Sequence, residues 1–101
     1  MVNQKNLEAR ISRNICSLHG LMRDMHTIAY VEDERLRIFE PVRGRIERIC
    51  STVTEQTKAL EPMNRVRAVR THIKVARIER ILWFIHMGLP VPKSLWGGWW
   101  L

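Results

Sequence analysis

Four basic residues in the C-terminal third of the chain are spaced like one side of a helix. Arg67, Arg70, Lys74 and Arg77 follow each other at intervals of 3, 4 and 3 residues, which places them in one row along an α-helix. An Arg side chain offers a fork of N–H donors to phosphate or carboxylate oxygens, and Lys offers a point charge. Contacts of this kind dominate the affinity of proteins for nucleic acids. This row, called the basic ridge below, is a candidate for binding phosphates or an acidic partner; the simplest alternative is a solvated basic face.

Three of the four tryptophans lie in the last six residues, as Trp96, Trp99 and Trp100. Each indole can bury about 200 Å², and each Å² buried contributes about 25 cal/mol of free energy. Summed over the three indoles, this gain nearly balances the cost of ordering the tail, which is about 1–2 kcal/mol for each of its residues. We therefore expect the tail to be ordered only where its indoles find a groove. Packing against its own bundle near Trp83 and Phe84 is the first expectation. A partner protein, for which the three tryptophans would be anchors, and a membrane interface remain alternatives.

Cysteine and histidine residues near the N-terminus have the types that bind metals, but not the spacing. Cys16 and His19 are one helical turn apart, His26 is two turns further on, and Cys50 would have to supply a fourth ligand. This pattern matches no standard zinc site. No metal or other cofactor is predicted, and the residues are interpreted as a surface thiol and boundary imidazoles.

Residue patterns typical of catalysis are not found in the sequence. His72 and His86 have no Ser or Cys near them in a recognisable arrangement. No Gly-rich phosphate loop and no pair of catalytic carboxylates follows a known motif. The expectation is that the protein is not an enzyme.

The length of the chain is typical of one small domain, and its positive net charge favours an anionic partner. The chain has 101 residues and a net charge of +7, from 17 basic and 10 acidic side chains. Residues 61–101 carry seven of the basic and only two of the acidic side chains, so the positive field is concentrated there. Two cysteines make no disulfide framework, and no apolar run is long enough to span a bilayer. We expect a cytoplasmic protein with reduced thiols and no membrane span.

Apolar residues recur at intervals of 3 and 4 along most of the chain, which predicts three long helices. The first is expected at about 4–29, the second at about 32–59 with a kink near Pro41, and the third at 62–87, ended by Gly88. The third helix carries two stripes and is expected to contact two neighbours, with the basic ridge between them. One stripe is Val66, Val69, Ile73 and Ala76; the other is Val75, Ile78, Leu82 and Ile85.

These patterns predict an all-α fold: a long antiparallel helical hairpin plus a third helix in residues 1–90, resembling a three-helix bundle, then an extended Trp-rich tail at 91–101. A homodimer that completes a four-helix unit is an open alternative. The function expected is non-enzymatic binding to a larger protein or assembly, as an accessory subunit or small inhibitor, through the Arg-rich helix and the Trp anchors. The alternative is an RNA- or DNA-binding protein that uses the basic ridge without sequence preference.

Overall fold

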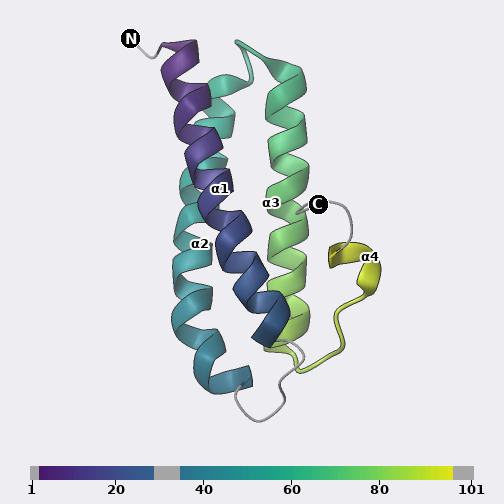
Figure 1. Cartoon of the computed structure of the whole chain (residues 1–101). Coiled ribbons are helices and arrows are strands. Elements are labelled where there is room, and N and C mark those ends of the chain that lie inside the picture. The colour runs from purple at the N-terminus through teal and green to yellow at the C-terminus, as the bar shows by residue number, and fades with distance from the viewer. Residues whose placement is uncertain (1–2, 29–34, 97–101) are drawn as a thin grey trace.

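The computed structural model describes the backbone of residues 3–28 and 35–96 and the side chains of residues 3–25 and 40–96. Consecutive long helices run antiparallel, and a one-turn helix lies beside the last of them (Figure 1). The elements are α1 (Gln4–Ile28), α2 (Arg35–Leu60), α3 (Arg65–His86) and α4 (Lys93–Trp96). The described ranges contain no strand, and the molecule is elongated, with extents of 48 × 25 × 21 Å. The all-α prediction with three packed helices is confirmed.

The predicted stripes of α1 and α2 form one wall of the core. On α1 the buried residues are Leu7, Ile11, Leu18, Met22 and Met25; on α2 they include Ile46, Cys50, Val53 and Leu60. The stripe predicted on α2 has the spacing Phe39, Val42, Ile46, Ile49, Val53, Gln56 and Leu60. Its polar member, Gln56, accepts a hydrogen bond of 3.0 Å from the side-chain amide of Asn14 on α1. Because a part-buried amide needs such a partner, this pair lets a polar residue occupy the stripe at little cost.

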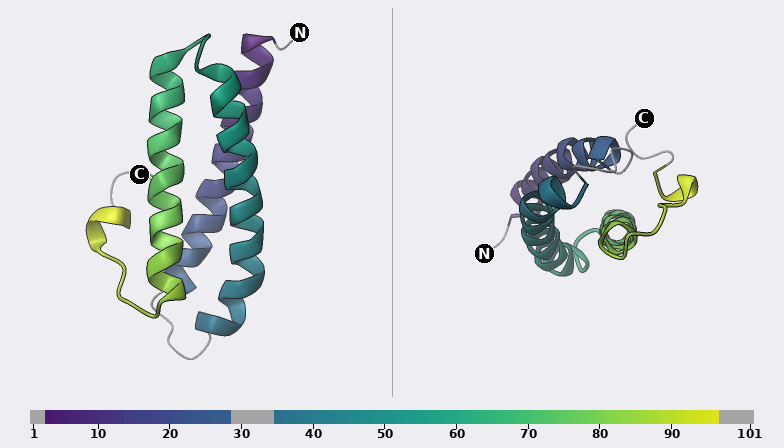
Figure 2. Two further views of the ribbon diagram at one scale, coloured as in Figure 1. Left: turned by 180° about the vertical axis from the view of Figure 1, so that it is seen from behind. Right: turned by 90° about the horizontal axis from the view of Figure 1, so that it is seen from below.

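The second stripe of α3 closes the core from the other side. Val75, Ile78, Leu82 and Ile85 are buried and belong to the same apolar cluster as the C-terminal half of the α1 stripe. At the opposite end of the molecule a smaller cluster joins α1 to the last residue of α2, Leu60. Viewed along the bundle, α1 and α3 both flank α2, and α4 lies beside α3 on the side away from α2 (Figure 2).

Asparagine side chains cap two of the helices. Asn3 accepts a hydrogen bond from the Lys5 backbone N–H at 2.8 Å, and Asn64 accepts one from Arg67 N–H at 3.2 Å. The helix α3 therefore begins at Arg65, three residues after the predicted start. The predicted start at Pro62 was too early, because residues 61–63 form the connecting turn and Asn64 is the better cap.

Replacing Asn64 by alanine is expected to lower the free energy of unfolding by about 1 kcal/mol, since α3 loses its cap. The same change also removes the 3.0 Å hydrogen bond that the Asn64 amide donates to Glu8. Urea unfolding followed by circular dichroism measures the loss. Asn6→Ala, at an exposed position inside α1, is the control and should not destabilise; an equal loss in both variants would contradict this role of Asn64.

The end of α3 follows the signal at Gly88. This glycine has a φ of 72°, a conformation that glycine adopts without steric cost. The Gly88 N–H donates to the Ile85 carbonyl at 3.1 Å, and the Leu89 N–H donates to the Phe84 carbonyl at 3.0 Å. Two otherwise unpaired carbonyls of the last turn are thereby satisfied, in the arrangement known as a Schellman motif.

Pro41 lies inside α2, as predicted, and the helix continues through it. Proline cannot donate to the carbonyl four residues earlier and its ring crowds that carbonyl. In Figure 1 the first turn of α2 points away from the direction of the rest of the helix. This is the bend expected of a helix that keeps going past a proline near its start.

Candidate binding surfaces

Most of the basic ridge lines a groove between α1 and α3. The groove has a volume of about 520 Å³. Three ridge residues, Arg67, Arg70 and Lys74, lie along the α3 wall, and the hydroxyls of Ser12 and Thr71 lie among them. The fourth ridge residue, Arg77, is exposed but does not line this groove. We call this surface the basic groove.

Arg67 is held at one end of the basic groove by contacts with α1. Its guanidinium donates to the Ser12 hydroxyl at 2.6 Å and lies 3.8 Å from a Glu8 carboxylate oxygen. Hydrogen bonds from Asn64 and Gln4, with a smaller contribution from the Arg67 charge, hold the pKa of Glu8 below its usual value. The charge of Arg67 is therefore partly neutralised, whereas no carboxylate among the described residues pairs with Arg70 or Lys74. A phosphate group would therefore be attracted more strongly to Arg70 and Lys74 than to Arg67.

The pKa of His19, on α1, is affected by positive charges near this groove. Burial lowers its pKa, and the nearby charges of Lys74 and Arg23 lower it further. Both effects disfavour the imidazolium form. The imidazole of His19 is therefore less easily protonated than that of a solvent-exposed histidine.

The outer face of α3 carries a row of apolar side chains that no other described segment covers. The row follows intervals of 3, 4, 3, 4, 3 and 4 residues, which is the spacing of a coiled-coil seam. We call it the α3 seam; its members are Val66, Val69, Ile73, Ala76, Arg80, Trp83 and Met87. The relative exposures are 64% for Val66, 48% for Val69, 49% for Ile73, 52% for Trp83 and 55% for Met87.

The first stripe predicted on α3, Val66 to Ala76, forms the N-terminal half of this seam. The helix α3 does contact two neighbours, but neither of them covers this stripe, whose Val66, Val69 and Ile73 are exposed. The residues of α3 that face the bundle are those of the other stripe, and both α1 and α2 pack on that side. The described chain has no further long helix to cover the opposite side of α3.

Charged side chains border the α3 seam on both sides. Arg70 and Arg77 directly follow two apolar seam positions, so they lie along one edge. His72, Glu79 and His86 precede seam positions and lie along the other edge. Within the seam, Arg80 is exposed and has no ion-pair partner among the described residues. The row of apolar groups is thus accompanied by three arginines that carry unneutralised charge.

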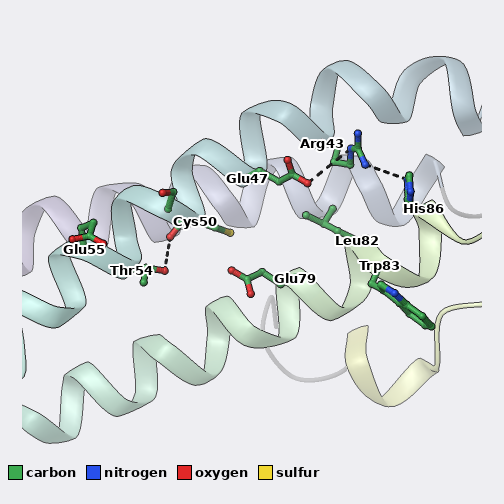
Figure 3. Close-up of a pocket in the computed structure, with 10 residues that line it drawn as sticks. Arg43, Glu47, Cys50, Thr54, Glu55, Glu79, Leu82, Trp83 and His86 are labelled. Atoms are coloured by element: carbon green, nitrogen blue, oxygen red, sulfur yellow. Dashed lines mark hydrogen bonds and ion pairs between the residues drawn. The ribbon is translucent and has the colours of Figure 1, made fainter.

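A second groove, of about 530 Å³, lies between α2 and α3 and is lined by carboxylates, among them Glu47 and Glu79 (Figure 3). Arg43, from α2, lies at one end of it, with Glu40 at 2.7 Å, Glu47 at 3.9 Å and the Nδ1 atom of His86 at 3.1 Å. We call this surface the acidic groove; no pattern in the sequence predicted it. Its carboxylates come from two helices that meet only through the long-range pairing of α2 with α3.

Cys50, at the floor of the acidic groove, is 2% exposed. Burial raises its pKa to about 12, and the charges of Glu79 and Glu47 add to the effect. We predict that a thiol reagent at about pH 8 labels one cysteine of the native chain, the exposed Cys16, because thiolate is the reactive form. Labelling in denaturant, counted by mass spectrometry, should reach both cysteines. Two rapid labels on the native protein would contradict the burial of Cys50.

The structure describes the tail only as far as Trp96. Trp96 is 4% exposed and belongs to the main apolar cluster, so its indole is a core group and not an exposed anchor. The tail was predicted to be extended, but residues 93–96 form a turn of helix. Trp99 and Trp100, the other predicted anchors, lie outside the described residues. Trp83, which the sequence analysis did not single out as an anchor, is instead the large exposed indole of the described chain.

Neither a cluster of metal-binding side chains nor a membrane-spanning helix occurs in the described ranges. Of the residues weighed as metal ligands, Cys16 is exposed and Cys50 is buried on another helix, and the side chain of His26 is outside the described set. No group of three or more metal-binding side chains occurs among the described residues. Nor does any helix in these ranges have the length and apolar character needed to cross a bilayer.

Comparison with models of known protein families, with curated proteins and with solved structures gives no match.

Proposed function

We propose that this protein is a non-enzymatic binding protein that docks onto a larger protein or assembly, as an accessory subunit or a small inhibitor does, through the outer face of α3. The proposal depends mainly on one observation. All seven large apolar side chains that are exposed in the described chain lie between Met63 and Leu89, and five of them belong to the α3 seam. Scattered exposed apolar residues are normal, but a continuous row on one face is typical of an interaction surface.

The residue types of the α3 seam agree with a docking role. Trp and Arg are enriched among the residues that contribute most to protein–protein affinity. The seam holds Trp83 at half exposure and Arg80 beside it, with Arg77 at its edge. Trp83 makes an edge-to-face contact with Phe84 at a centroid distance of 5.1 Å. This contact holds the indole before a partner arrives, which reduces the entropy lost on binding.

Co-purification of the tagged chain from its source cells, after nuclease treatment, tests the proposal. The Ile73→Glu variant is expected to lose the bound protein, because a carboxylate would be buried without a partner in an apolar interface. Ala59→Glu makes the same change of charge at an exposed site on α2 and should retain it. Equal recovery with both variants would show that the α3 seam is not the docking face.

The second candidate function is RNA or DNA binding without sequence preference, and the basic groove is the observation that favours it. Arg70 and Lys74 lie there without carboxylate partners, next to the hydroxyl of Ser12, which can donate to a phosphate oxygen. Binding of this kind loses affinity steeply as salt rises.

We predict that, if this second function operates, Arg70→Glu with Lys74→Glu abolishes binding to a fluorescent oligonucleotide. Arg45→Glu with Arg48→Glu, at exposed sites on α2, makes the same change of net charge and serves as the control. Fluorescence anisotropy at several salt concentrations measures both. Equal losses in the two double variants would indicate that net charge matters and the basic groove does not.

A further inference from the structure

The α3 seam has the length and register of one side of a helix pair. It runs from Val66 to Met87, which is about 32 Å at a rise of 1.5 Å per residue. Alternating intervals of 3 and 4 residues let side chains of a facing helix fit between those of the seam. A loop or a flat sheet would not follow so regular a row over that length.

We propose that the occupant of the α3 seam is an acidic amphipathic helix of another protein, which rests on the proposed function. The charges around the seam determine the chemistry of that helix. Arg70 and Arg77 border one edge and Arg80 lies within the row, and none of the three has an ion-pair partner in the described chain. An apolar stripe with carboxylates along the side that meets Arg70 and Arg77 complements such a face, because these arginines gain partners when the stripe covers the seam. The other edge of the seam carries Glu79, so the flanking carboxylates belong on one side of the occupant.

Arg80 adds a requirement on register. It takes the fifth of the seven seam positions, where a facing apolar residue would remove its guanidinium from water without compensation. A facing Glu or Asp would instead make an ion pair inside the interface. A single polar position of this kind fixes the register of paired helices. The occupant is therefore a helix with a carboxylate within its apolar stripe as well as beside it.

A second copy of this chain is a poor occupant for the same reason. In a parallel pairing, Arg80 would face its own counterpart. In an antiparallel pairing centred on Ala76, Arg77 would face its counterpart, and Arg80 would face the apolar Ile73. Like charges opposed across a helix pair are unfavourable, so the seam disfavours self-association.

Three synthetic helices of about four heptads test the inference on the full-length protein. The acidic probe has Leu in its stripe, Glu beside it and one Glu placed to face Arg80. The basic probe has Lys beside the stripe, and the scrambled probe has the composition of the acidic one without its periodicity. By isothermal titration calorimetry, the acidic probe is expected to bind at least tenfold more tightly than either of the others.

Two substitutions assign the site and the register. Arg80→Leu should reverse the preference between the acidic probe and a probe with Leu at the position that faces residue 80. Ile73→Glu should abolish binding of the acidic probe, whereas the double variant Arg45→Glu with Arg48→Glu should leave it within about twofold, because those sites lie off the seam. Circular dichroism verifies that each variant keeps its helix content.

The outcomes separate this inference from the proposed function. Equal binding of the acidic and scrambled probes would overturn the inference, since charge alone would account for it. Failure of the acidic probe, with Ile73→Glu still removing a partner in co-purification, would overturn the acidic helix and leave the docking face standing. A dimer in sedimentation equilibrium that Ile73→Glu dissociates would make a second copy the occupant. If Ile73→Glu changes none of these readouts, the docking face itself is wrong.

Discussion

The Trp96→Ala variant is expected to lose about 3 kcal/mol of unfolding free energy, the low end of the range for removing a buried tryptophan. The indole of Trp96 is 4% exposed and packs in the cluster shared by the three long helices. Its removal leaves a large space in the apolar cluster. The loss is placed at the low end because α4 is a single turn near the end of the chain and can shift to close part of that space. Urea unfolding measures the loss.

Trp83→Ala is the matched control for that variant, because the same residue type is removed from a half-exposed site. Its edge contact with Phe84 is lost, which should cost less than about 1 kcal/mol. Equal stability losses in the two variants would show that burial does not separate the two tryptophans. A stable Trp96→Ala variant would mean that the tail does not contribute to the core.

The same Trp83→Ala variant is expected to weaken binding of the docked partner by about 30-fold or more, which corresponds to about 2 kcal/mol for an anchoring residue. The expectation follows from the position of Trp83 in the α3 seam at 52% exposure. Surface plasmon resonance with the partner recovered by co-purification measures the affinity. Trp96→Ala should thus mainly lower the free energy of unfolding, and Trp83→Ala should mainly lower the affinity for the partner.

Met63→Ala is the control for affinity. Met63 is also a large apolar residue, 41% exposed, but it lies in the turn before α3 and outside the seam. Its removal should change the affinity by less than about threefold. If Met63→Ala weakens binding as much as Trp83→Ala, the partner does not follow the seam.

Local periodicity was sufficient to predict the three long helices and the buried faces of α1 and α2. The stripes of α1 and α2 needed no information beyond spacing, since a helix with one apolar side must bury that side. Gly88 ended α3 as expected because the left-handed conformation it adopts is specific to glycine. The start of α3 was placed too early because proline and asparagine both signal a helix start, and only the backbone shows which one is used.

The surfaces were harder to predict, because they depend on which helix each stripe meets. Val66, Val69 and Ile73 have the same pattern whether they pack on a neighbour or face solvent, and the number of neighbours is a property of the whole bundle. The acidic groove depends on the pairing of α2 with α3, which brings Glu47 near Glu79. Likewise, no sequence feature distinguished Trp96 as a core residue.

The most direct test of the docking face is crosslinking from a photoreactive amino acid placed at position 73 of the chain in its source cells, with position 59 of α2 as the reference. We predict that position 73 crosslinks to one partner protein, and that peptide mapping places the crosslink in a helical segment rich in Glu and Asp. Crosslinks from position 59 but not from position 73, or crosslinks from 73 only to nucleic acid, would contradict it.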